Sequence, residues 1–126
     1  MGMIDHVSLG VSDLERSIAF YDAVLAPLGY RRLWSNERGA GYGVQGIDEP
    51  LAILATGDRA RAAGAGTHLA LTARSHAAVD GFHTAAIGLG ASDEGAPGLR
   101  PHYGDGYYAA FVLDPDGHKL EAVCHG

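Results

Sequence analysis

The sequence has one cysteine, Cys124, among its 126 residues, so no disulfide can form within the chain. A fold that needs no disulfide needs no oxidising compartment. The first residues contain no basic segment followed by an apolar run, as a secretion signal would. No apolar stretch approaches the roughly 20 residues that span a bilayer. We therefore expect a cytoplasmic protein.

Basic residues are also scarce: 9 Lys and Arg stand against 15 Asp and Glu, which gives a formal net charge of −6. The basic residues are scattered along the chain, and a negative balance repels phosphate backbones and anionic lipids. Nucleic acids and membranes are therefore poor partners, and we expect a small-molecule ligand. The length and a hydrophobic share of 47% fit one ordinary globular domain.

The most informative feature present is an internal repeat with an offset of 62 residues. Residues 68–72 repeat residues 6–10, so that His68 falls on His6, and Phe82 falls on Phe20 by the same offset. The repeat predicts two copies of one structural unit.

Each copy is predicted to contain a strand, a helix and three further strands. The first copy predicts strands at 3–10, 30–35, 41–47 and 51–55, and the second predicts strands at 68–72, from 91 onwards, at 107–113 and at 118–124. The first helix is predicted to begin at Ser12, which forms a capping box with Glu15, and to end at Gly29 after an irregular turn at Pro27. The second helix is predicted at 75–87.

These elements predict an α+β fold of two tandem βαβββ modules. The single domain covers residues 1–126, with module 1 at about 3–56, a glycine-rich linker at 57–66 and module 2 at about 67–125.

Three candidate metal ligands lie on strands whose residues alternate between two faces. His6, His68 and Glu121 each alternate with apolar neighbours, so all three are predicted to point away from the helices. Taken singly, a strand histidine or glutamate is usually solvated or hydrogen-bonded. Together they form a two-histidine, one-carboxylate set, which leaves coordination positions open for a substrate and suits Fe, Mn, Ni or Zn.

Further polar and aromatic residues cluster before and within the strand at 107–113. His102 and Tyr108 are candidate acid–base residues beside Glu121. Tyr107 and Tyr108 must point in opposite directions, so at most one lines the pocket. Four residues are candidates for the substrate pocket: Ser8, Trp34, Arg100 and Tyr103. Cys124 is predicted to be a small buried residue, and His118 is predicted to be exposed in a turn.

The sequence resembles the vicinal oxygen chelate superfamily in three segments: DHVSL at 5–9, SDLERS at 12–17 and FVLDPDGHKLE at 111–121. That superfamily includes glyoxalase I, extradiol dioxygenases, fosfomycin-resistance transferases and bleomycin-binding proteins. The resemblance implies a curled mixed-sheet cup with helices on the outside and a divalent metal on His6, His68 and Glu121. It also implies a substrate that chelates the metal through two neighbouring oxygens, and a homodimer.

Two functions stay open at this point. The first is a metal-dependent lyase, isomerase or dioxygenase, and the alternative is a metal-free binding protein of the bleomycin-resistance type. Glyoxalase I usually adds a fourth ligand on the last strand of its first module. Aligning residues 47–48 with 113–114 puts Ala55 opposite Glu121, and alanine cannot coordinate a metal. The three-ligand pattern of the dioxygenases and fosfomycin enzymes fits better.

Overall fold

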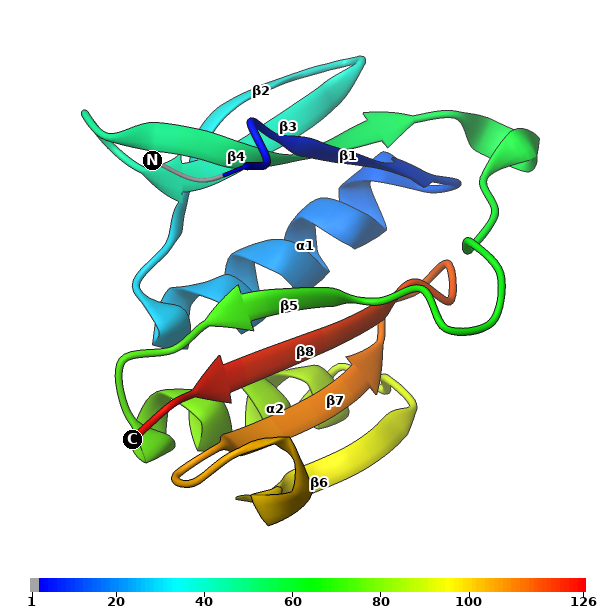
Figure 1. Cartoon of the computed structure of the whole chain (residues 1–126). Coiled ribbons are helices and arrows are strands. Elements are labelled where there is room, and N and C mark those ends of the chain that lie inside the picture. The colour runs from blue at the N-terminus through cyan, green and yellow to red at the C-terminus, as the bar shows by residue number, and fades with distance from the viewer. Residues whose placement is uncertain (1–2) are drawn as a thin grey trace.

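A computed structural model describes residues 3–126, without the side chains of residues 48 and 49, and contains both predicted βαβββ units (Figure 1). The first unit consists of β1 (Val7–Val11), α1 (Leu14–Leu25), β2 (Arg31–Asn36), β3 (Gly39–Val44) and β4 (Asp48–Ala55). The second consists of β5 (Leu69–Thr72), α2 (His76–Gly88), β6 (Asp93–Leu99), β7 (Tyr108–Leu113) and β8 (Lys119–Cys124). Three 3-10 turns, η1 (Ala26–Leu28), η2 (Gly57–Arg59) and η3 (Pro101–Tyr103), complete the elements. The predicted fold class is confirmed.

The strands form two mixed sheets of four strands each, with the orders β1-β4-β3-β2 and β5-β8-β7-β6. In each sheet the first and last strands of the unit pair in parallel, and the other pairs are antiparallel. In the part of the chain that the structure describes, β1 pairs only with β4 and β5 only with β8. One edge of each of these two strands therefore has no strand partner.

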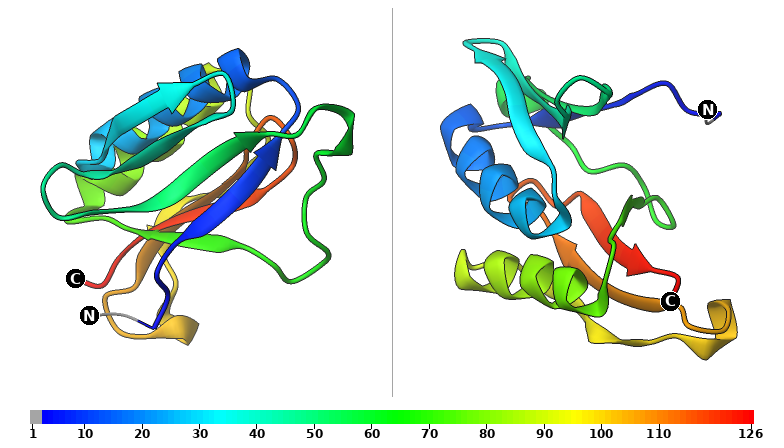
Figure 2. Two further views of the ribbon diagram at one scale, coloured as in Figure 1. Left: turned by 90° about the horizontal axis from the view of Figure 1, so that it is seen from above. Right: turned by 90° about the vertical axis from the view of Figure 1, so that its left-hand side faces the viewer.

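Each helix covers one face of its own sheet, and the two helices lie side by side (Figures 1 and 2). The repeat-equivalent residues Phe20 and Phe82 are both buried in the shared core. A Cβ atom built on Gly81 would lie 2.9 Å from Cβ of Pro27, so α2 and η1 approach closely at this point. No helix within residues 3–126 combines the length and the apolar character needed to span a bilayer.

The start of α1 differs from the prediction. The N-cap is Asp13, whose side chain accepts a hydrogen bond from the backbone N–H of Arg16 at 3.2 Å. The backbone N–H of Ser12 donates instead to the carboxylate of Asp116, on the turn between β7 and β8. A contact with a residue 104 positions away thus replaces the local capping box. The irregular end of the helix at Pro27 and the left-handed Gly29, with φ of 89°, are as predicted.

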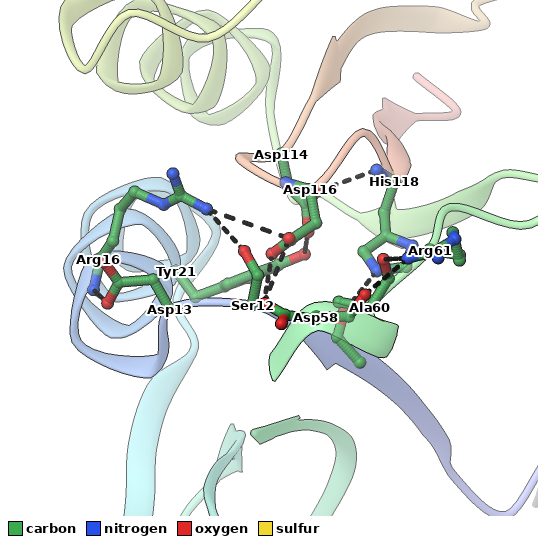
Figure 3. Close-up of polar contacts among 11 residues, drawn as sticks. Ser12, Asp13, Arg16, Tyr21, Asp58, Ala60, Arg61, Asp114, Asp116 and His118 are labelled. Carbon is green, nitrogen blue, oxygen red and sulfur yellow. Dashed lines mark hydrogen bonds and ion pairs between the residues drawn. The ribbon is translucent and has the colours of Figure 1, made fainter. Parts of the chain in front are cut away.

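The turn between β7 and β8 joins the two modules through a buried polar network (Figure 3). The hydroxyl of Tyr21, on α1, donates to Asp114 Oδ2 at 2.6 Å. Asp114 Oδ1 also accepts from the backbone N–H groups of Asp116 and His118. His118 Nε2 lies 2.8 Å from the carbonyl oxygen of Gly10. The prediction that His118 is exposed is therefore wrong: it is 8% exposed because the turn packs against β1.

Candidate metal and substrate site

Glu121 and His68 meet on the helix-free face of the second sheet, the face directed away from α2. Glu121 lies on β8 in register with Ala70 on β5 and Phe111 on β7, so these three residues share that face. His68, two positions before Ala70, shares it as well. Glu121 Oε1 lies 3.1 Å from His68 Nε2. The Glu121 residue is 1% exposed, whereas the side chain of His68 is 41% exposed.

Tyr107 holds the second oxygen of the same carboxylate. Its hydroxyl donates a short hydrogen bond to Glu121 Oε2. Burial, followed by this hydrogen bond, raises the pKa of Tyr107 to about 12. The hydroxyl is therefore protonated at neutral pH and acts as a donor that fixes the orientation of the carboxylate.

A cavity of about 430 Å³ opens above these groups. Besides His68 and Glu121, three more of the predicted site residues line it: Arg100, His102 and Tyr103. The full lining is His68, Glu94, Arg100, His102, Tyr103, Tyr107, Phe111, Lys119 and Glu121. The rings of His102 and Tyr103 lie 4.2 Å apart at its rim.

Tyr108 lies on the opposite side of β7 from this cavity. Its ring stacks on His76 at 3.9 Å, and its hydroxyl donates to Asp80 of α2 at 2.6 Å. The tyrosine that reaches Glu121 is therefore Tyr107 and not the predicted Tyr108. The alternation put Tyr107 and Tyr108 on opposite faces, but the choice between them needed the register of Phe111 with Glu121, because residues 107, 109 and 111 share a face.

His6 lies apart from this pair in the single chain. It directly precedes β1, its Nδ1 is 2.7 Å from Asp5 Oδ1, and its side chain is 63% exposed. Among the side chains that the structure describes, no three from His, Cys, Asp or Glu lie where they could hold one ion together. One chain therefore brings together two of the three predicted ligands.

Ser8 and Trp34 lie on the helix-free face of the first sheet. Ser8 is in register with Ala52, Ala52 with Gly41, and Gly41 with Trp34. Ser8 lines a second cavity of about 840 Å³, which His68 also lines. The indole of Trp34 covers the backbone of Gly41, where a Cβ atom would lie 2.0 Å from the indole nitrogen.

The strand register corrects the position in module 1 that corresponds to Glu121. Ser8 pairs with Ala52, and its repeat equivalent Ala70 pairs with Glu121. The equivalent position is therefore Ala52, three residues before the predicted Ala55. Alanine cannot coordinate a metal, so neither Ala52 nor Ala55 supplies the fourth ligand expected for glyoxalase I. Cys124 is a free, buried thiol in the core, as predicted.

Comparisons with known proteins agree on one family. A model of the Glyoxalase/Bleomycin resistance protein/Dioxygenase superfamily matches residues 3–122. Among solved structures, a glyoxalase/bleomycin resistance protein from Albidiferax ferrireducens is similar at 35% identity and a TM-score of 0.82, over 97% of this chain and 98% of that one. A putative glyoxalase from Bacillus halodurans is similar at 30% identity and a TM-score of 0.71, over 98% and 96% of the two chains.

The fosfomycin resistance protein FosX from Listeria monocytogenes has a similar fold, with a TM-score of 0.68 at 18% identity over 98% of this chain and 93% of that one. None of the functionally curated proteins matches the sequence.

Proposed function

Since the chain belongs to the Glyoxalase/Bleomycin resistance protein/Dioxygenase superfamily, we propose that it is a metal-dependent enzyme acting on a small molecule. The substrate would chelate the metal through two neighbouring oxygens, in a lyase, isomerase or dioxygenase reaction. The ion would be Fe, Mn, Ni or Zn, held by His68 and Glu121 of one protomer and His6 of a second copy. The cytosol is the proposed location.

The observation that supports this proposal most is the buried carboxylate of Glu121 beside an imidazole. A buried carboxylate is costly unless it is paired or bound to a metal. Oε1 and Nε2 of the pair are 3.1 Å apart, a separation that suits two donors converging on one ion. His68 is partly exposed toward two cavities, so an ion and a small molecule can reach it. These two residues therefore fit as part of a metal site.

The same geometry supports a third ligand from a second copy. His6 is exposed directly before β1 of the first sheet, and the His68–Glu121 pair lies on the helix-free face of the second sheet. In a two-fold dimer, the first sheet of each protomer could face the second sheet of its partner. His6 of each protomer would then meet the partner's His68–Glu121 pair, which gives two equivalent sites per dimer. The same association would cover the edges of β1 and β5 that have no strand partner among the described residues.

The roles of the side chains follow from their contacts. A bound divalent ion would supply a Lewis acid that stabilises negative charge on the substrate oxygens. The Tyr107 hydroxyl keeps Glu121 oriented, and Phe111 gives the cavity an apolar floor. His102, exposed at the rim, can accept or return a proton of a bound molecule.

The test is metal binding by purified protein and by single variants. We expect about one ion per chain in the wild type, and a loss of affinity of at least about tenfold in His6→Ala, His68→Ala and Glu121→Gln. His76→Ala is the matched control, because His76 stacks on Tyr108 on the other side of β7. Equal affinity in all four variants would refute the proposed ligand set.

A second function, metal-free binding of a small molecule, is favoured by one specific observation. His68, Glu121 and Tyr107 already form a continuous chain of contacts that satisfies the buried carboxylate without an ion. A protein that binds none of Fe(II), Mn, Ni or Zn near stoichiometry would support this alternative.

A further inference from the structure

Two cationic side chains converge on one aromatic ring next to the proposed metal ligands. Cζ of Arg100 lies 5.6 Å from the centroid of Phe111, and Nζ of Lys119 lies 5.3 Å from the same centroid. The negative face of the ring attracts each cation. Arg100, Lys119 and Phe111 line the same cavity, so an anion in that cavity would be attracted by both cations.

Arg100 is fixed in its orientation by the backbone. Its Nη1 donates to the carbonyl of Gly98 and its Nη2 to the carbonyl of Ala96, both at 2.8 Å. Two of the five guanidinium N–H groups are thereby used, and the charge is held at the cavity without being neutralised. A guanidinium fixed in this way can bind a carboxylate or phosphate with little further loss of side-chain freedom.

The charge of the two cations is left available by their neighbours. Among the side chains that the structure describes, neither Arg100 nor Lys119 forms an ion pair. Glu94 lines the same cavity, but it is exposed and pairs with neither cation. The other carboxylate, Glu121, contacts His68 and Tyr107. An incoming anion would therefore meet two cations.

We propose that Arg100 and Lys119 bind an anionic group of the substrate, a carboxylate or a phosphate, over the ring of Phe111. This rests on the proposed function, because the metal-binding oxygens of the same molecule would reach His68 and Glu121. Phe111 and Glu121 are register neighbours on adjacent strands, which lie about 4.8 Å apart. The substrate is then a small molecule whose anionic group is a few bonds from its two neighbouring oxygens.

The experiment titrates metal-stripped protein with acetate, inorganic phosphate and neutral acetamide, followed by NMR signals of the Phe111 ring. We expect the anions to shift these signals and acetamide to leave them unchanged. Tighter binding of phosphate than of acetate would assign the phosphate class, and the reverse order would assign the carboxylate class. Arg100→Gln and Lys119→Gln should each weaken anion binding by about tenfold.

Arg74→Gln is the matched control, since Arg74 is exposed and lines none of the cavities described above. Arg100→Gln also removes two hydrogen bonds to backbone carbonyls and could disturb the fold. Lys119→Gln removes a cation without removing such hydrogen bonds, so it tests the subsite independently. Mn²⁺ binding, measured on the same samples by water proton relaxation, separates the two proposals. Intact Mn²⁺ binding with no anion response, or with equal responses in all three variants, would overturn the anion subsite and leave the metal site standing. Anion binding without Mn²⁺ binding would overturn the metal site alone.

Discussion

Tyr21→Phe is expected to destabilise the protein strongly although it removes a single oxygen atom. The Tyr21 hydroxyl and Asp114 Oδ2 are 2.6 Å apart, and both residues are buried. The variant leaves one oxygen of a buried carboxylate without its donor, a loss of about 2 kcal/mol for a hydrogen bond to a charged group. For a domain of this size, that corresponds to a fall of about 8 °C in the midpoint of thermal unfolding.

Tyr108→Phe is the matched control for this variant. The Tyr108 hydroxyl also bonds an aspartate at 2.6 Å, but that contact, to Asp80, is exposed. Water can replace the lost hydroxyl at the exposed Asp80. The chemical-denaturation midpoint of Tyr108→Phe should therefore shift several times less than the midpoint of Tyr21→Phe. Equal shifts in the two variants would refute the argument from burial.

The pH dependence gives a second measure of the same contact. Burial, and then Asp114, raise the pKa of Tyr21 well above its ordinary value. Above a pH of about 10 the unfolded chain ionises its tyrosines, while folded Tyr21 keeps its proton. The folded state then binds more protons than the unfolded state, so stability falls as the pH rises. The stability difference between wild type and Tyr21→Phe should be constant below pH about 10 and shrink above it. A constant difference up to pH 11 would contradict the assignment.

Two further variants test local features of the fold. Gly41→Ala should shift the fluorescence of Trp34, the only tryptophan, because its Cβ would lie 2.0 Å from the indole nitrogen; Gly64→Ala, with open space around it, should leave the emission unchanged. Asp13→Ala should lower the free energy of unfolding by about 1 kcal/mol, as loss of an N-cap does, whereas Glu15→Ala should have a smaller effect if Asp13 caps α1. Urea unfolding of both variants checks this. A larger loss of stability in Glu15→Ala than in Asp13→Ala would support the capping box of Ser12 and Glu15 instead.

The local elements were predictable because each follows from a short pattern. Alternation predicted the strands, and Pro27 with Gly29 predicted the irregular end of the first helix. The repeat placed His68 on His6 and showed that each begins a module. The strand and helix signals need only neighbouring residues, and the repeat needs only a comparison within the chain, so one sequence contains them in full.

Contacts between distant segments could not be predicted in the same way. Ser12 was assigned to a local capping box, but its N–H donates to Asp116, which depends on how β7 and β8 pack against β1. His118 is buried for the same reason. The choice between Tyr107 and Tyr108 needed the register of β7 with β8. The separation of His6 from the His68–Glu121 pair follows from the packing of the two modules, which no local pattern encodes.

The most direct test of the proposed site is metal binding by a mixture of two variants, each of which lacks one of the proposed metal ligands. His6→Ala and Glu121→Gln each lack a ligand at every site. If His6 serves the partner's His68–Glu121 pair, each mixed dimer contains one intact site. After unfolding and refolding together in equal amounts, about half of the dimers are mixed, so about one quarter of the wild-type metal sites should return. If no metal sites return although mixed dimers form, the ligands do not come from two chains, and the proposed shared site is wrong.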